Sequence, residues 1–172
     1  MQIQVIDQQT TLPLSETVTL GVVNRQPAIY LTPAAVGSLF PESTLCGGVA
    51  AFGVAAVAVN SDGTLNDCRN PAVAGSVVTV FVDGLGPVTP ALATGAIAAA
   101  PPLPLTPAFV ALDDGNSPVP TSTLSLPGAI TGVSQLQFQL PQSLGAGPYA
   151  FGPTLDGAPL RERLIVVWAR PN

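Results

Sequence analysis

The chain contains no histidine and no lysine, and its five basic residues are all arginine. The usual nucleophilic triads need a histidine base and the Ser-Lys alternative needs a lysine, so neither can be built from this sequence. A zinc site needs four Cys, His or carboxylate ligands at characteristic spacings, which the chain does not offer. We therefore expect a protein that is not an enzyme and that holds no metal and no cofactor.

Charged residues are also scarce. They make up 9% of the chain, against about 25% in a typical globular domain, and the net charge is −5. No basic patch is available to neutralise phosphates, so we expect no nucleic-acid partner. The apolar run at residues 47–59 is shorter than the roughly 18–20 residues of a membrane-spanning helix, so we expect no membrane span. The N-terminal MQIQVID lacks the basic start and apolar stretch of a signal peptide. We expect that a secreted parent has lost its signal peptide, or that this chain is an excised piece.

Only two cysteines are present, Cys46 and Cys68. With no further cysteine or histidine to complete a metal site, they form either a disulfide or two free thiols. Closing a loop of this length stabilises the folded state by about 3 kcal/mol in the chain-entropy model, and the rest of the composition is typical of an extracellular protein. We predict that Cys46 and Cys68 are bridged. The alternative is a pair of unrelated buried thiols in a cytosolic protein.

What the chain does have is the pattern of many short strands and turns. Its 19 prolines and 17 glycines separate runs that favour strand, and residues 93–100 are the only stretch with a pattern that could indicate a helix. The predicted strands, about nine in all, include residues 3–6, 17–23, 54–59, 76–82, 108–112, 119–126, 134–140 and 164–169. Residues 84–107 are rich in Ala and Pro, and many of their positions lack an N–H, so they predict a long loop that runs along the surface.

The most regular alternation occurs at residues 134–140. One face carries Leu136, Phe138 and Leu140, and the other carries Gln135, Gln137 and Gln139. One face is therefore buried and the other wet, as in an antiparallel sandwich. The whole pattern predicts an all-β, immunoglobulin-like antiparallel β-sandwich with long Pro/Ala-rich loops.

Two segments resemble a known family. The first is NSDGTLNDCRNPAVAGSVVTVFVDGLGPVTPALATGAIAAAPPLPLTP, and the second is LPGAITGVSQLQFQLPQSLGAGPY. Both are similar to the C-terminal domain of large, uncharacterised secreted proteins of acidobacterial type. The matching positions, spread over residues 28–169, are Asp62-Gly63, Asn70-Pro71-Ala72, Gly75, Gly84-Leu85-Gly86, Pro90, Gly95, Gly128, Gln135, Pro141 and Gly145. The resemblance implies an extracellular or cell-surface Ig-like module with no established activity. The cysteine pair and Arg161-Glu162-Arg163 depart from the family pattern.

We expect two parts, an N-terminal β-hairpin at residues 1–25 and a sandwich domain at residues 26–172. The resemblance implies that the hairpin consists of the closing strands of a preceding module. The apolar face of the hairpin consists of Ile3, Val5, Val18, Leu20 and Val22. An isolated two-stranded hairpin is marginal in water, so this face should find a partner. Fold-back onto the same chain or a loose packing between modules is favoured over strand pairing with another copy, because the short link at residues 24–27 keeps the hairpin close to its own domain.

Two acidic segments invite a functional interpretation. Asp113 and Asp114 could act as the paired carboxylates of a glycosidase, but adjacent residues point to different sides and the following Gly115-Asn116 indicates a turn. Residues 60–67 carry side-chain oxygens that faintly suggest a calcium site. Calcium takes six to eight oxygens, and the EF-hand register is missing. A turn whose Asn and Asp side chains bond their own backbone explains the same residues.

Ligand binding would fall to the few aromatic residues and the amide row. Sugar-binding sandwiches place exposed rings beside amides, so the candidate contacts are Tyr149, Trp168, Gln135, Gln137 and Gln139, with Tyr30 also considered. A tryptophan in a strand that is apolar on both faces is more often core, and a glutamine row is more often a solvated face. We favour a non-catalytic extracellular structural or adhesive module that contacts other protein modules or copies of itself. The alternative is a carbohydrate-binding module.

Overall fold

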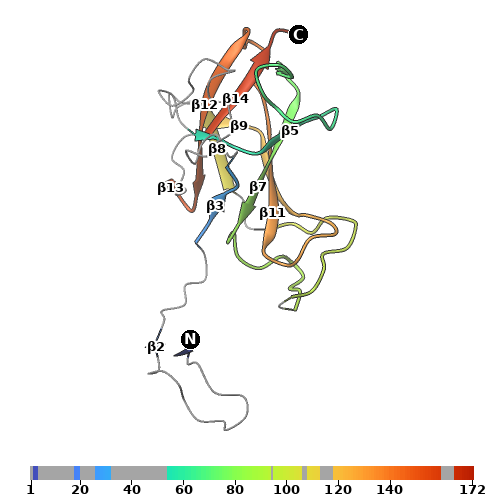
Figure 1. Ribbon diagram of the computed structural model, residues 1–172, viewed down its shortest axis with the longest axis vertical. Helices are drawn as coiled ribbons and strands as arrows, with labels where there is room; N and C mark the ends of the chain where they lie inside the picture. The colour runs from blue at the N-terminus through green and yellow to red at the C-terminus, as the bar shows by residue number, and fades with distance from the viewer. Residues whose placement is uncertain are drawn as a thin grey trace.

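The structure is a computed structural model, and it describes residues 2–3, 18–19, 26–31, 54–93, 95–105, 108–112, 118–159 and 165–172. These residues contain fourteen strands and no helix. Most strands belong to two sheets that face one another, as Figure 1 shows. The predicted all-β sandwich is therefore confirmed.

The first sheet is antiparallel and has β7 (Val77–Asp83) at its centre. On one side of β7 lies β11 (Val133–Gln139), followed by β10 (Thr121–Ser125). On its other side lie two short strands end to end, β3 (Ala28–Ile29) and β5 (Ala58–Asn60). The strand predicted at residues 76–82 corresponds to β7, one residue later along the chain.

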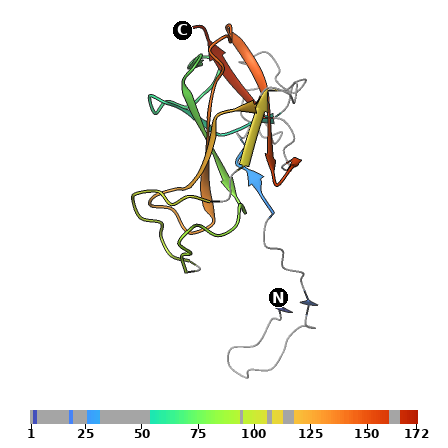
Figure 2. The ribbon, with the colours of Figure 1, turned by 180° about the vertical axis from the view of Figure 1, so that it is seen from behind.

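The second sheet is built around β12 (Gly147–Leu155). One neighbour of β12 is β14 (Ile165–Arg170), which also pairs in parallel with β4 (Val54–Ala55) and β6 (Ala72–Val73). The other neighbour is β8 (Ala108–Leu112), followed by β9 (Pro118–Val119), while the short β13 (Ala158–Pro159) pairs with the end of β12. Figure 2 shows this sheet from behind.

The core lies between the sheets and follows the alternation of the sequence. In β7, Val78, Val80 and Val82 are fully buried, while the residues between them are more exposed. The rings of Phe138 from β11 and Phe151 from β12 meet across the interface, with centroids 5.1 Å apart and planes tilted by 47°. Aromatic pairs prefer such tilted contacts, and this pair joins the two sheets at the centre of the core.

Two segments that were each predicted as one strand are each divided between the two sheets. Both of these predictions are wrong. Residues 119–126 were expected to form one strand, but β9 pairs with β8 in one sheet and β10 pairs with β11 in the other. Pro120 lies at the change of sheet. It cannot donate to a ladder, although its carbonyl accepts a hydrogen bond from Gln139 N (2.9 Å). Residues 54–59 likewise split between β4 and β5, which belong to different sheets.

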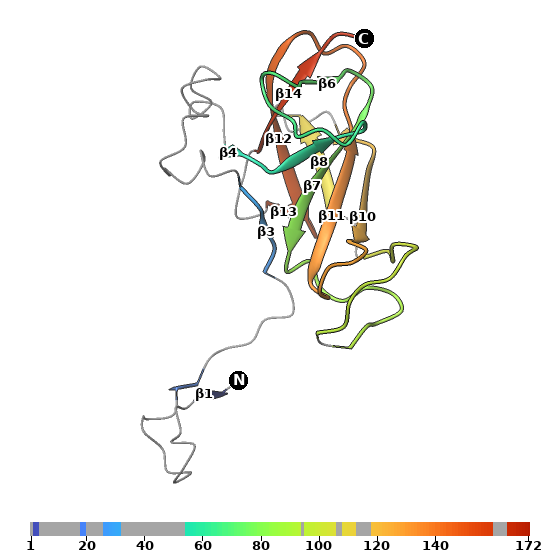
Figure 3. The ribbon, with the colours of Figure 1, turned by 45° about the vertical axis from the view of Figure 1, so that its right-hand side comes forward.

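The Ala/Pro-rich segment after β7 forms no strand in its described part, residues 84–93 and 95–105, as expected. It does, however, cover the outer edge of β10. Leu105 N donates to Thr123 O (3.1 Å), Ser125 N donates to Leu103 O (2.8 Å), and Leu103 N donates to Ser125 Oγ (2.8 Å). Farther out, the segment projects beyond the end of β10 and β11 (Figure 3). The edge strand is thereby closed to pairing with another chain.

The N-terminal hairpin is present as a two-stranded antiparallel sheet of its own. β1 (Gln2–Ile3) pairs with β2 (Val18–Thr19), with Gln2 opposite Thr19 and Ile3 opposite Val18. The remaining residues of the predicted hairpin lie outside the described residues, and its fold-back onto the sandwich stays a prediction.

Candidate functional site

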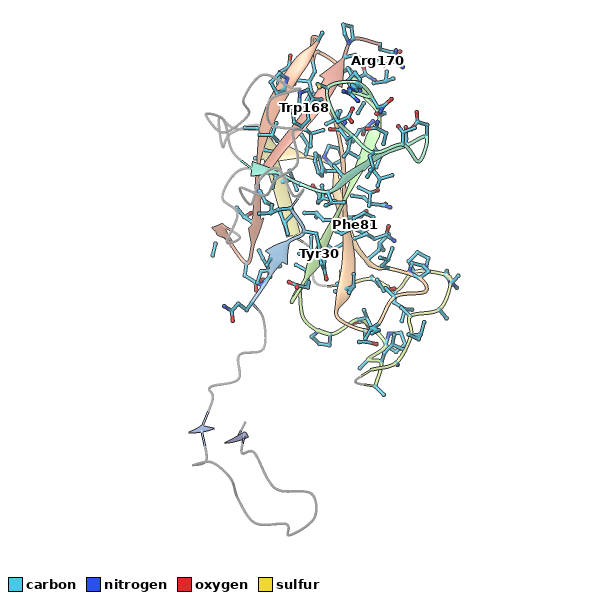
Figure 4. All side chains as sticks on the ribbon, viewed as in Figure 1. Tyr30, Phe81, Trp168 and Arg170 are labelled. Atoms are coloured by element: carbon cyan, nitrogen blue, oxygen red, sulfur yellow. The ribbon has the colours of Figure 1, made fainter. Side chains whose placement is uncertain are left out.

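The structure does not bring the five predicted ligand contacts together. Gln135, Gln137 and Gln139 lie on β11 in the first sheet, whereas Tyr149 and Trp168 lie on β12 and β14 in the second. Trp168 (labelled in Figure 4) is only 8% exposed, so its ring offers little free surface to a ligand. The interpretation of Trp168 as a buried residue agrees with this placement.

Tyr149 has a structural contact that accounts for its position. It packs against the core, and its hydroxyl accepts a hydrogen bond from Gly145 N (2.9 Å) in the connection between β11 and β12. The side chain therefore holds the bend that leads from one sheet to the other.

A buried amide network that the sequence reasoning missed supports the backbone of Trp168. Asn66 Nδ2 donates to Trp168 O (2.9 Å) and to Asn60 Oδ1 (2.8 Å), while Trp168 N donates to Asn66 Oδ1 (2.8 Å). Asn60 Nδ2 in turn donates to Asn70 O (2.8 Å). Because β4 pairs with residues 165–166 and β6 with residues 169–170, the Asn66 side chain fills the gap between them along β14.

In the loop at residues 60–67, which suggested a calcium site, side-chain oxygens of Asp62 and Asp67 accept hydrogen bonds from the loop itself and the residues just after it. Asp62 Oδ1 accepts hydrogen bonds from Thr64 N (3.0 Å) and Thr64 Oγ1 (2.6 Å). Asp67 Oδ1 accepts from the backbone N–H groups of Arg69 (2.8 Å) and Asn70 (2.7 Å). The bonds from Thr64, its hydroxyl first, lower the pKa of Asp62 below its ordinary value. These contacts are those of Asx turns.

Other candidate sites fall partly or wholly outside the described residues. Asp113 and Asp114 are outside them, and so is Cys46. Cys68 is not a free thiol. Its pairing with Cys46 stays a prediction. Where the chain is described, it holds no group of three or more His, Cys, Asp or Glu residues placed to share a metal ion.

The outer surface of the first sheet presents a regular array of uncharged side chains. Pairing between strands sets two rows across it. The first row is Tyr30, Phe81, Gln135 and Leu124, and the second is Val59, Thr79, Gln137 and Ser122. We call these eight residues the neutral face. Tyr30 joins its row through a hydrogen bond from its N–H to Phe81 O (2.9 Å), and its side chain is 42% exposed.

The glutamines of β11 are tied into this array without using all of their hydrogen-bonding groups. Gln135 Nε2 donates to Ser125 O (3.0 Å), and Gln137 Nε2 donates to Gln135 Oε1 (3.2 Å). Ser122 Oγ makes a long contact of 3.5 Å with Gln137 Oε1. Just beyond the face, Gln139 Nε2 donates to Gly75 O (2.9 Å). The predicted exposed side of residues 134–140 is thus an ordered amide ladder.

The neutral face owes its lack of charge to the sequence. No charged residue occurs between Asp83 and Asp113, or between Asp114 and Asp156, and these two stretches supply β8 to β12. Asp83, at the end of β7, is a charged residue beside the face. Tyr30 and Phe81 were not predicted to meet, because nothing in the sequence shows that β3 pairs with β7.

Comparisons with protein-family models, with curated proteins and with solved structures give no match to this chain. Within the described ranges, no helix is long and apolar enough to cross a membrane.

Proposed function

We propose that this chain is a non-catalytic extracellular module of immunoglobulin-like topology, with a structural or adhesive role in contacts between proteins. The strand order supports the topology. In an Ig domain one sheet runs A-B-E-D and the other includes C-F-G, and here the corresponding orders are β3-β7-β11-β10 and β8-β12-β14. The bond from Gly145 N to the Tyr149 hydroxyl lies at the E–F connection, where Ig domains have a tyrosine corner.

One observation carries the proposed role: the outer edges of β10 and β14 are covered, whereas β1 and β2 pair only with each other among the described residues. Residues 103 and 105 cover β10, and β4, Asn66 and β6 line the edge of β14. Covered edges prevent unwanted pairing between neighbouring modules. Among the described residues, β1 and β2 have outer edges without a strand partner, to which a strand of another protein or of a second copy can add.

Light scattering on the intact chain and on a version that starts at Gln26 tests this role. If the hairpin pairs with other copies, the intact chain should assemble as its concentration rises and the shorter version should stay monomeric. If the hairpin folds back instead, both versions stay monomeric, and the amide hydrogens of residues 2–3 and 18–19 are protected from exchange in the intact chain. Assembly of both versions to the same extent would contradict a role for the hairpin.

A further inference from the structure

The neutral face combines aromatic rings, amides and hydroxyls on one side of a sheet. Tyr30 and Phe81 lie opposite each other where β3 meets β7, joined by the backbone hydrogen bond from Tyr30 N to Phe81 O, and both residues are labelled in Figure 4. On β11, the neighbour of β7 opposite to β3, Gln135 pairs with Phe81, and Gln137 pairs with Thr79 in the second row. Rings, amides and hydroxyls are therefore placed side by side by the backbone pairing of the sheet, with no loop needed to position them.

The amides of this face have unused hydrogen-bonding capacity. Each Gln amide nitrogen carries two hydrogens, and Gln135 and Gln137 each donate one hydrogen bond from that nitrogen within the described residues. Each therefore has a second N–H for a ligand. Amides and the Thr79 hydroxyl can both donate and accept, and so can the hydroxyls of a sugar. A hydroxyl-rich ligand can thus replace the water on this face without leaving polar groups unpaired.

The lack of charge narrows the class of ligand. With no cation on the face, an acidic polymer would gain no ion pair, and Asp83 and the net charge of −5 would repel it. A neutral polymer avoids the cost of removing water from ions. The side chains of Tyr30 and Phe81 each supply apolar surface against which the C–H groups of a sugar ring can pack.

We propose that the neutral face binds a neutral polysaccharide, with Tyr30 and Phe81 stacking against sugar rings and Gln135, Gln137 and Thr79 bonding their hydroxyls. The rows cross four strands, so the site suits a polymer with repeated units better than a single sugar. A second copy of this chain fits less well, because the buried core of a protein interface is more apolar than the rest of the surface. The neutral face has amides and hydroxyls at its centre. This inference does not depend on the role proposed for the hairpin.

The experiment measures depletion of the intact protein from solution by insoluble polysaccharides. The neutral probes are microcrystalline cellulose, chitin and mannan, and calcium alginate serves as the acidic comparator. We expect retention on at least one neutral polymer and none on alginate. Tyr30→Ala should weaken retention about tenfold, the equivalent of one aromatic contact, and Gln137→Ala should also weaken it.

Two control variants make the result specific. Ile130→Ala removes an exposed apolar residue outside the face, where Ile130 is 58% exposed, and should retain full binding. Tyr30→Phe keeps the ring and should bind nearly as well as the unchanged protein, and unfolding curves identify any variant that has lost its fold. The proposal is overturned if no neutral polymer retains the protein, or if Ile130→Ala loses as much binding as Tyr30→Ala. It is also overturned if sedimentation velocity shows a dimer that Gln137→Arg dissociates while no polysaccharide binds, because the occupant is then a second copy.

Discussion

Replacement of Asn66 by alanine should remove three buried hydrogen bonds at once. Asn66 donates to Trp168 O and Asn60 Oδ1 and accepts from Trp168 N, all within 2.9 Å. Alanine would leave both backbone groups of Trp168 without a partner in a site closed to water. Since a buried group that loses its partner costs about 1–3 kcal/mol, two such groups should lower the free energy of unfolding by roughly 3 kcal/mol.

The measurement is urea unfolding followed by tryptophan fluorescence. Trp168 is the only tryptophan in the chain and lies next to the substituted residue, so the signal reports on this part of the sandwich. Asn70→Ala is the matched control. The Asn70 side chain is exposed and makes one long contact with Asp67 Oδ1 (3.4 Å), so its loss should change stability by less than about 0.5 kcal/mol.

A third variant distinguishes the accepting role of Asn66 Oδ1 from the donating role of Asn66 Nδ2. Asn66→Asp keeps an oxygen that can accept from Trp168 N, but an ionised carboxylate cannot donate to Trp168 O and is costly to bury. We expect it to be at least as unstable as Asn66→Ala at neutral pH, and to recover in part in acid, when the protonated carboxyl can donate. The reasoning is refuted if Asn66→Ala unfolds within about 0.5 kcal/mol of Asn70→Ala, because the network would then contribute nothing beyond an exposed amide.

Three further outcomes can be checked with simple assays. Tyr149→Phe should lower the free energy of unfolding by about 1 kcal/mol, because Gly145 N loses its acceptor, whereas Tyr30→Phe should leave it unchanged. The pKa of Asp62 is lower in the folded protein than in the unfolded chain, so the stability that Asp62 contributes is present above the unfolded pKa and is lost as the pH falls through the folded pKa. The NMR signal of the Thr64 amide should titrate with the Asp62 carboxyl, and Asp62→Asn should abolish this titration. The unreduced protein should be about 2 Da lighter than the reduced form if Cys46 and Cys68 are bridged, and two alkylatable thiols in the native sample would contradict the bridge.

The sequence was most informative where a strand stays within one sheet. The run at residues 108–112 was predicted with the bounds of β8, and the alternation at residues 134–140 identified the buried and exposed sides of β11 correctly. In both strands the two-residue period reflects a constant environment on each side, and such a pattern can be read from the chain alone.

Changes of sheet could not be predicted, because they leave the local pattern intact. Residues 54–59 pair first with β14 and then with β7. Pro120 separates β9, which pairs with β8, from β10, which pairs with β11. The candidate site was missed for a related reason. Tyr30 and Phe81 are far apart in the sequence and meet only through the pairing of β3 with β7. Asn66 was interpreted as part of a turn, since no local signal shows that its amide reaches a strand about a hundred residues away.

The arrangement along β14 determines how the domain responds to tension. Its partners β4 and β6 come from the first half of the chain and run parallel to it, and the Asn66 amide holds the intervening residue. A pull on the C-terminal end of β14 acts along the strand, so these hydrogen bonds are loaded in shear and share the force. In a hairpin pulled open from its ends, the bonds would instead break one after another. Because forced unfolding is controlled by the unfolding barrier, this edge should make the domain resistant to mechanical extension, with the side chain of a single asparagine bearing part of the load.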